Sequence, residues 1–207
     1  MTFKNPPVQD KPVMVIDAEN WFGNKAFAHK GVIYRIEDIV GITSNNGSIS
    51  INFVPISHYC EFSLILSNGN ILRFGANSSI VKTKKVKNLS EVSDFISKIT
   101  FDQRAYPYLQ KIQTNGFFQY HDYFIYDNGD IKYKSNTINI AEAGLQNNVE
   151  FGTEREFISS YSTPNEITVS QKIPGNFFKK SICIKIKENR DVIYAILFKL
   201  SKLKMPK

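Results

Sequence analysis

A change of hydrophobic period, which occurs twice along the chain, constrains the fold most strongly. In each half, short segments in which apolar and polar residues alternate precede a stretch in which apolar residues recur every three or four positions. The two stretches of longer period carry these stripes: Leu89, Val92, Ile96 and Ile99, then Val192, Ile196, Leu200 and Leu203. Alternation is typical of half-buried strands, and the longer period of amphipathic helices. The sequence therefore predicts two runs of strands, each closed by a helix.

The predicted strands are best marked in three places. Apolar residues alternate with polar ones at 49–53, 60–66 and 182–186. Asn68-Gly69 and Asn128-Gly129 follow predicted strands, and Asn-Gly favours hairpin turns because both residues tolerate a positive φ. Residues 20–24 are predicted to form a turn that carries two aromatic side chains, Trp21 and Phe22.

Three helices are predicted. The first spans 89–99, with Asn88 and Glu91 as a capping box at its start. A short second helix lies within 101–116, with Pro107 in its first turn, where a missing N–H costs least. The last spans 189–203, with Asn189 as its N-cap.

The length of 207 residues and the 42% hydrophobic content suffice for one large domain or two of roughly 100 residues. We interpret residues 1–12 as an extended N-terminal arm and 13–100 as a first β domain closed by its helix. Residues 101–116 are then a helical linker, and 117–207 a second β domain closed by the helix 189–203. A single mixed α+β domain with one larger sheet is the alternative.

Several strands followed by one terminal helix, as in 13–100 and 101–207, resemble the pleckstrin-homology-like (PH-like) superfold. The resemblance lies in the order of elements and in no residue motif. It implies an α+β, β-rich chain of two half-open antiparallel barrels or sandwiches, each capped by a C-terminal amphipathic helix. PH-like domains mostly recognise proteins, peptides or lipid headgroups, so the resemblance also implies a binding function.

Motifs that carry catalysis are missing from the sequence. It contains no Walker-type loop, GxGxxG, GxSxG or HExxH. His58 and Cys60 share one side of a predicted strand, but no second pair of metal ligands accompanies them. Cys183 is expected to be an exposed thiol, and the acidic residues around Arg155 are expected to be solvated. We therefore expect no catalytic residue, metal or cofactor, with an enzyme whose site forms between the halves as an alternative.

Positive charge is concentrated in two places, within a net charge of +7. The candidate residues for binding an anion or a partner are Lys82, Lys84, Lys85, Lys87, Phe177, Phe178, Lys179, Lys180, Lys185 and Lys187. The first group is predicted to lie on a loop or edge strand, where lysines also prevent strand pairing between molecules. The second group combines aromatic and basic residues, which suits a membrane surface or stacked bases. Arginine, which dominates base readout, occurs only five times, and this disfavours nucleic acid.

The remaining features concern the compartment. No apolar stretch approaches the ~20 residues of a membrane span, and the N-terminus lacks the apolar segment of a signal peptide. The cysteines, Cys60 and Cys183, lie far apart in the sequence, which favours free thiols in a cytoplasmic chain. We expect a non-catalytic protein-binding module, an adaptor or an immunity-type inhibitor of a protein partner. The alternative is a peripheral binder of anionic membrane lipid or another polyanion.

Overall fold

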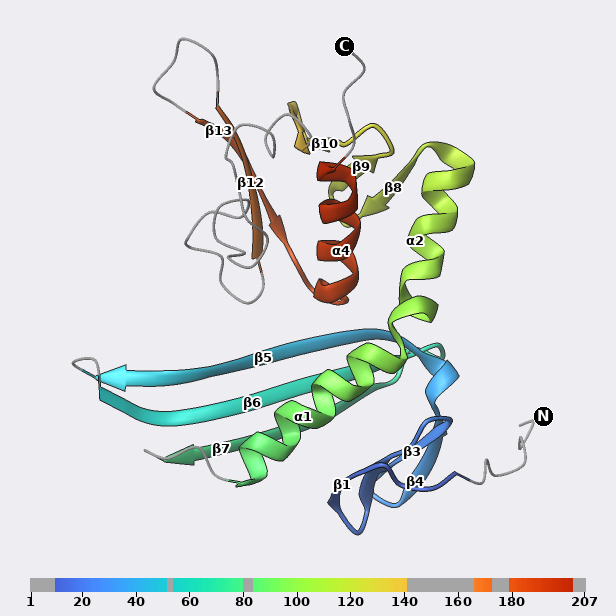
Figure 1. Cartoon of the computed structure of the whole chain (residues 1–207), viewed down its shortest axis with the longest axis vertical. Helices are drawn as coiled ribbons and strands as arrows, with labels where there is room; N and C mark the ends of the chain where they lie inside the picture. The colour runs from blue at the N-terminus through green and yellow to red at the C-terminus, as the bar shows by residue number, and fades with distance from the viewer. Residues whose placement is uncertain (1–9, 52–53, 80–83, 141–165, 173–178, 203–207) are drawn as a thin grey trace. The chain divides into compact units, whose positions relative to one another are not determined.

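The computed structural model describes residues 10–51, 54–79, 84–140, 166–172 and 179–202 (Figure 1). The chain divides into two compact units, unit 1 with residues 1–104 and unit 2 with residues 105–207. Each unit is described by itself below. The described part of the chain is α+β and rich in strands, as predicted, and its four antiparallel sheets contain no closed barrel.

Unit 1 begins with four short strands in a meander, here called the first meander. Its strands are β1 (Met14–Asp17), β2 (Asn20–Phe22), β3 (Ala26–His29) and β4 (Val32–Arg35), and they pair in that order. A single 3-10 turn, η1 (Ile36–Asp38), leads into a second sheet of three long strands. These are β5 (Ile39–Ile51), β6 (Val54–Leu66) and β7 (Ile71–Ser79), also antiparallel.

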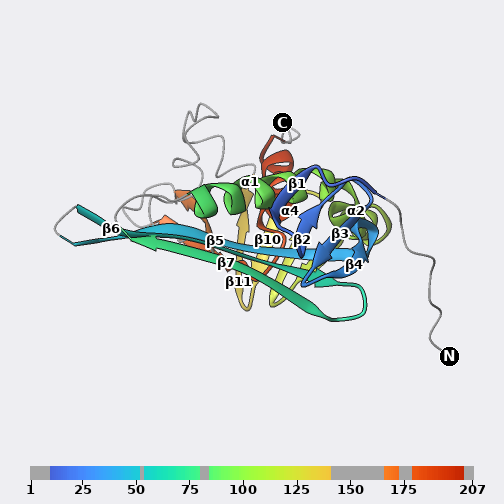
Figure 2. The same ribbon diagram turned by 90° about the horizontal axis from the view of Figure 1, so that it is seen from below.

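The helix α1 (Lys84–Ile99) packs against one face of the long sheet (Figure 2). The strand β6 shows why, because its alternating side chains Cys60, Phe62, Leu64 and Leu66 are all buried. The helix contributes a matching buried stripe of Val86, Leu89, Val92 and Ile96. Because Val86 already belongs to this stripe, the helix begins five residues earlier than predicted, and the capping box at Asn88 and Glu91 is wrong.

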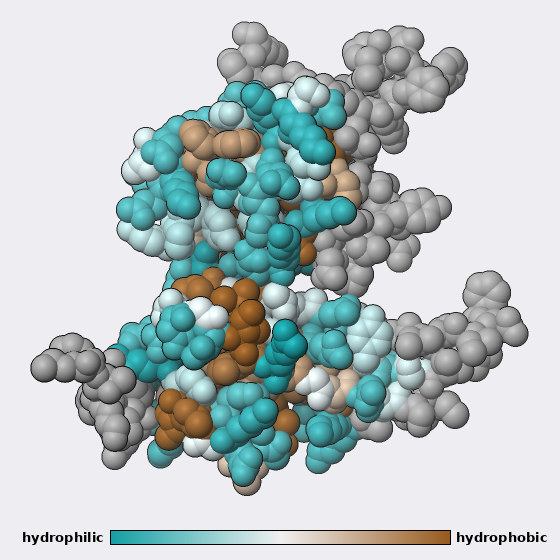
Figure 3. Space-filling view, turned by 180° about the vertical axis from the view of Figure 1, so that it is seen from behind, coloured by the Kyte–Doolittle hydropathy of each residue, from teal (hydrophilic) through white to brown (hydrophobic). Residues whose placement is uncertain are grey.

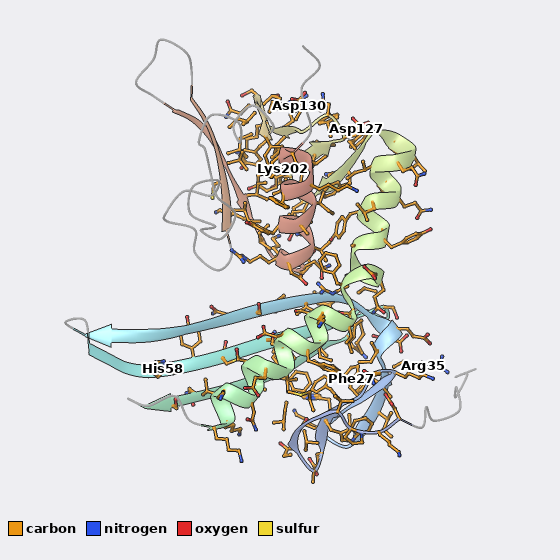
Figure 4. All side chains as sticks on the ribbon, viewed as in Figure 1. Phe27, Arg35, His58, Asp127, Asp130 and Lys202 are labelled. Carbon is orange, nitrogen blue, oxygen red and sulfur yellow. The ribbon has the colours of Figure 1, made fainter. Side chains whose placement is uncertain are left out.

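Aromatic rings join the first meander to the long sheet. The ring of Phe22 on β2 lies 5.3 Å from those of Phe27 on β3 and Phe74 on β7. Phe74 in turn stacks on Phe62 at 4.7 Å. His29 meets Phe74 edge-on at 4.5 Å, and burial lowers the pKa of this imidazole, which favours its neutral form. Figure 4 shows Phe27 among the side chains between the meander and α1. This aromatic cluster fixes which face of the meander is buried.

The strand β2 corrects one expectation. Residues 20–22 were predicted to be part of a turn, yet Trp21 and Phe22 form strand pairs with β1 and β3. The strand has only three residues, and turn-forming residues stand at its first position, Asn20, and directly after it, Gly23-Asn24, which hides it in the sequence. The full burial of Phe22 explains why the chain is extended there.

The helix α2 (Phe101–Asn115) begins in unit 1 and continues into unit 2. In unit 1 its Gln103 side chain donates hydrogen bonds to the carbonyls of Ile36 and Ile39 at 2.9 and 2.8 Å. Pro107 was predicted in the first turn of this helix, but it lies in the helix interior, so that prediction is wrong. In unit 2 the Tyr108 ring contacts Phe118 edge-on at 5.2 Å.

Unit 2 contains a second meander of the same strand order. Its strands are β8 (Phe117–Tyr120), β9 (Tyr123–Tyr126), β10 (Asp130–Tyr133) and β11 (Asn136–Asn139). The described residues then form a hairpin of β12 (Glu166–Lys172) and β13 (Lys179–Lys185) and the helix α4 (Arg190–Ser201). Asn189 is the N-cap residue of α4, but its backbone is left-handed (φ 55°) and its side chain makes no capping hydrogen bond.

The hairpins β3–β4 and β10–β11 match residue by residue. Adding 104 to both members of the pair Ala26–Arg35 gives Asp130–Asn139, and the same holds for the other three pairs. Lys30 and Lys134, at the same place in the two turns, both have a positive φ. Ile36 and Ile140 follow the hairpins, both buried, and their N–H groups bond to the equivalent carbonyls of Lys25 and Gly129.

Tyrosine hydroxyls hold the end of β13 in unit 2. The Tyr120 hydroxyl donates to the Glu188 carbonyl at 2.8 Å and accepts from the N–H groups of Lys187 and Glu188. Tyr123 similarly donates to the Cys183 carbonyl and accepts from Lys185. Burial raises the pKa of Tyr120 to about 12, so its hydroxyl remains a donor well above neutral pH.

We expect Tyr120→Phe to lower the free energy of unfolding by about 1–3 kcal/mol, because it leaves three backbone groups near the start of α4 without their partner. The matched control is Tyr126→Phe, since the Tyr126 hydroxyl has no hydrogen-bond partner among the described residues; its effect should stay within about 0.5 kcal/mol. Urea denaturation followed by far-UV circular dichroism measures both. Equal effects of the two variants would contradict the role given to Tyr120.

Candidate functional site

The ten residues proposed from the sequence divide into three groups. Lys82, Phe177 and Phe178 lie outside the described residues. Lys179 and Lys180 belong to β13, where their backbone alone is described, and Lys185 and Lys187 are exposed at its end. Lys84, Lys85 and Lys87 belong to unit 1 and the other four lysines to unit 2.

Lys84, Lys85 and Lys87 lie in the first turn of α1, so the prediction of a loop or edge strand is wrong for these three residues. No acidic residue accompanies them in that turn. Since the helix dipole already makes this end positive, the lysines are unfavourably placed for the stability of the helix. Only Lys87 has a counter-charge on the helix, with its Nζ 3.9 Å from a Glu91 carboxylate oxygen.

Side chains suited to metal binding do not cluster among the described residues. No group of three His, Cys, Asp or Glu side chains there has the geometry to hold a metal ion. Cys60 is buried, Cys183 is exposed as predicted, and both are free thiols. Glu150, Glu154, Arg155 and Glu156 lie outside the described part of the chain.

A surface that the sequence did not single out is the outer face of the first meander. The strand register places Val15, Trp21, Ala28 and Ile33 side by side across all four strands. We call these four residues the outer row. Because side chains alternate along a strand, the outer row lies on the face opposite to Met14, Phe22, Phe27 and Tyr34, which face the core.

Apolar side chains of the outer face are open to solvent. Val15 is 54% exposed and Ile33 49%, and Val13, which precedes β1 on the same face, is 51% exposed. Trp21, the only tryptophan of the chain, is half-buried, and Ala28 between Trp21 and Ile33 is covered. Figure 3 shows apolar side chains as dark brown patches on the surface of unit 1. Adjacent exposed apolar side chains of this kind are typical of contact surfaces.

Asp10 fixes one end of this face. Its carboxylate accepts hydrogen bonds from the backbone N–H groups of Lys25 and Ala26, and these bonds lower its pKa. Gly23 lies directly beneath the same carboxylate, where a Cβ atom would collide with the Asp10 side chain and the Lys11 carbonyl. Arg35 points away from the meander (Figure 4) and pairs with Glu37 at 2.6 Å.

The opposite end is formed by two turns that lie side by side. Asp17 accepts from the Asn20 amide at 2.8 Å and from the Glu19 N–H, and these bonds lower the pKa of Asp17. The Gly31 N–H donates to the Glu19 carbonyl, so the β1–β2 turn is bonded to the β3–β4 turn. The outer face therefore ends in exposed charges of both signs: Glu19 in the β1–β2 turn and Lys30 in the β3–β4 turn.

The second meander has a different outer face. Its inner row is apolar and buried like that of the first: Phe118, Ile125, Ile131 and Ile138. Its outer row, in the same register, reads Gln119, Phe124, Lys132 and Thr137. Polar side chains thus stand where unit 1 has Val15, Ala28 and Ile33. The meander does not need an apolar outer row to fold, so the outer row of unit 1 requires another explanation.

The sequence contains a sign of this surface. Residues 13–16 and 32–34 are continuous apolar runs, whereas a strand with one solvated face alternates. A run that is apolar at every position indicates that both faces of the strand contact apolar surroundings. The sequence alone does not reveal the open face, because the cross-strand row appears only once the register is known.

Comparisons with known proteins give no further information. No protein-family model matches the sequence, and no curated protein or solved structure was found to be similar to it. Among the described residues, no helix is both long and apolar enough to cross a bilayer.

We expect the double substitution Val15→Gln and Ile33→Thr, which introduces the residues of the second meander, to change the free energy of unfolding by less than about 1 kcal/mol. Both side chains are half-exposed, so little apolar contact is lost. By contrast, Phe27→Ala on the inner face should cost about 3–5 kcal/mol because it leaves a cavity in the aromatic cluster. Thermal and urea unfolding test this, and a large loss of stability in the double variant would make the outer row a part of the core.

We expect Lys84→Glu to stabilise α1 by about 0.3–1 kcal/mol at low salt, because a negative charge suits the positive end of the helix. Lys84→Gln, which only removes the charge, should give a smaller gain. Denaturation at low and high ionic strength distinguishes the two variants, since salt screens the effect of the charge on the free energy of unfolding. A loss of stability in Lys84→Glu would show that the lysine has a favourable contact in the folded chain.

Proposed function

We propose that the chain is a non-catalytic protein-binding module, and that the outer face of the first meander is its contact surface. One observation carries the proposal: the outer row is apolar in unit 1, with Val15 and Ile33 about half exposed, whereas three of the four equivalent positions in unit 2 are polar. When a partner covers the exposed side chains of Val15 and Ile33, their apolar surface is removed from water. This contributes about 25 cal/mol to the free energy of binding for each Å² of apolar area buried.

The composition of the surface suits a protein partner. An aromatic residue between aliphatic ones, with charges at the rim, is the usual arrangement of a protein–protein contact. Trp21 lies within the outer row, and tryptophan is among the residues that most often carry binding energy. A role as adaptor or as inhibitor of another protein is consistent with this arrangement.

An anionic partner has less support. Of the ten residues expected to bind one, Lys82, Phe177 and Phe178 lie outside the described residues, and the placed lysines belong to two different units. Lipid or polyanion binding therefore stays the second candidate.

A duplication of one domain would account for the likeness of the two units. Both have a meander, then antiparallel strands, then a helix, and the common offset of 104 between β3–β4 and β10–β11 supports a shared origin. The assignment to the PH-like superfold rests on the order of elements alone. On this proposal unit 1 has the exposed row for binding, and unit 2 has a polar face at the same place.

The test is affinity capture with the tagged full chain in a lysate of its native cells, followed by quantitative mass spectrometry. We expect the wild type to retain at least one protein in stoichiometric amount, its own untagged copy included, and Val15→Gln/Ile33→Thr to lose most of it. The control is Ile71→Thr, which removes an aliphatic side chain of equal exposure (54%) from the long sheet of the same unit. Equal recovery by all three chains would refute the contact surface.

A further inference from the structure

The outer face of the second meander has an aromatic half and a polar half. Each of its four strands turns two side chains outward, because side chains alternate along a strand and the row that includes Ile125 and Ile131 is buried. Beside the outer row of this meander lies a second outward row, which reads Phe117, Tyr126, Asp130 and Asn139 across the strands. We call the two rows together the mixed face. Its aromatic residues all belong to β8 and β9, and its charged residues all belong to β10.

Three aromatic rings of the mixed face contact one another and remain partly open to solvent. The centroid of the Phe117 ring lies 5.5 Å from that of Tyr126 and 5.9 Å from that of Phe124. All three side chains are partly buried and partly exposed. Figure 3 shows a pale brown, apolar patch on the surface of unit 2, surrounded by hydrophilic side chains. The rings lie outside the buried row of the meander, so burial in the core does not explain why aromatic residues occupy these positions.

The Asp130 carboxylate, which neighbours Tyr126 across the β9–β10 hairpin, is held in one orientation (Figure 4). Its Oδ1 accepts a hydrogen bond from the Asn139 amide at 2.8 Å, and its Oδ2 accepts one from the Asn128 amide at 3.0 Å. The Asn139 amide also donates to the Asn128 carbonyl at 3.2 Å. Both donors are neutral, and each carboxylate oxygen can accept a further hydrogen bond. Asp130 therefore presents two fixed acceptors at the edge of the aromatic half.

The charges of the mixed face disfavour an ionic ligand. Asp130 and Lys132 have opposite charges and lie two residues apart on β10, on the same side of the sheet. Lys132 is the cross-strand neighbour of Phe124, so a cation that stacks on this ring meets a lysine. An anion meets Asp130 and, in the adjoining turn, the exposed Asp127. A neutral ligand avoids both repulsions.

We infer that the mixed face binds a neutral carbohydrate, as a short run of pyranose rings. A pyranose ring has an apolar face of C–H groups and an edge of hydroxyl groups. The C–H groups suit the negative faces of aromatic rings, and the hydroxyls can donate to Asp130 and accept from Lys132. A wholly apolar ligand would instead take the Asp130 carboxylate out of water without a substitute hydrogen bond. The inference goes beyond the proposed function, because it concerns unit 2.

The size of the mixed face sets the expected affinity. Four strands ~4.8 Å apart and two outward positions ~6.8 Å apart along each strand give a face of about 14 by 7 Å. A flat face of this size leaves part of a sugar in water, unlike a pocket that buries most of its ligand. We therefore expect a dissociation constant on the order of 0.1–10 mM for a hexasaccharide.

The measurement is titration of the ¹⁵N-labelled full chain, followed by ¹H–¹⁵N correlation spectra. The probes are neutral hexasaccharides of β-1,4-linked glucose, xylose, mannose and N-acetylglucosamine and of α-1,4-linked glucose. We expect at least one of them to shift amide signals of residues 117–139 in a saturable way at concentrations up to about 10 mM. Adenosine and a lysine hexapeptide are the comparison probes, since they would report a site for stacked bases or for a cation.

Matched variants make the test specific. Phe117→Leu and Phe124→Leu keep an apolar side chain but remove the planar ring, and each should weaken binding at least about tenfold. Asp130→Asn should weaken binding about three- to tenfold, because a neutral acceptor replaces a charged one. The controls are Tyr106→Leu, at a tyrosine of α2 that is 63% exposed, and Asp122→Asn, at an exposed aspartate of the β8–β9 turn. Both controls should bind as the wild type.

Circular dichroism confirms that each variant folds. Lys132→Ala, at an exposed position of the mixed face, replaces any variant that does not fold, and it should weaken binding about threefold.

Three outcomes would overturn the inference. The first is a wild type in which none of the hexasaccharides shifts an amide signal of residues 117–139. The second is binding that the Phe117, Phe124 and Asp130 variants leave unchanged, which places the sugar on another surface. The third is a response to adenosine or to the lysine hexapeptide alone, which assigns the face to a base or a cation. None of these results bears on the capture experiment, which tests a surface of unit 1.

Discussion

The contact between the rings of Phe22, Phe27, Phe62 and Phe74 is the interaction on which the rest of unit 1 depends. It joins a meander of strands only three or four residues long to a sheet of strands up to 13 residues long. Strands as short as β2 gain little from their own hydrogen bonds, and the packing of aromatic side chains supplies the missing stability. Because Phe22 and Phe27 must face the cluster, the register of β2 and β3 is fixed.

That fixed register has a consequence for the opposite face. A slip of one residue would move every side chain of a strand to the other side, so burial of Phe22 and Phe27 also determines that Trp21 and Ala28 point away from the core. The packing of the core therefore determines which side chains form the outer row, and no further interaction is needed to orient them. What is particular to unit 1 is the chemistry of these positions, since the second meander has the same buried row but Gln119, Lys132 and Thr137 outside. The fold positions the surface, and a few residues decide whether it is apolar.

Local signals predicted a good part of this fold. Alternation located β6 and β13, Asn-Gly located the turns before Asn70 and Asp130, and apolar stripes located α1 and α4. Sequence reasoning failed where tertiary contacts override local preference: β2 lies among turn-forming residues, and α1 extends through lysines that oppose its dipole because Val86 is buried. The candidate surface was missed for a related reason. Val15, Trp21, Ala28 and Ile33 are up to 18 residues apart in the chain, and only strand pairing brings them into one row. Charge, which is visible without a structure, drew the prediction toward the lysines.

The central claim is that the aromatic cluster buries one face of the first meander and leaves Val15 and Ile33 of the outer row open to solvent. Single cysteines introduced into a Cys183→Ser background test it most directly, through their rates of alkylation under native conditions. We predict that Val15→Cys and Ile33→Cys react within about tenfold of the exposed Cys183 thiol in the wild type, and that Phe27→Cys and Phe22→Cys react only through unfolding. Rapid labelling at 22 or 27, or protection at both 15 and 33 in dilute protein, would contradict the account.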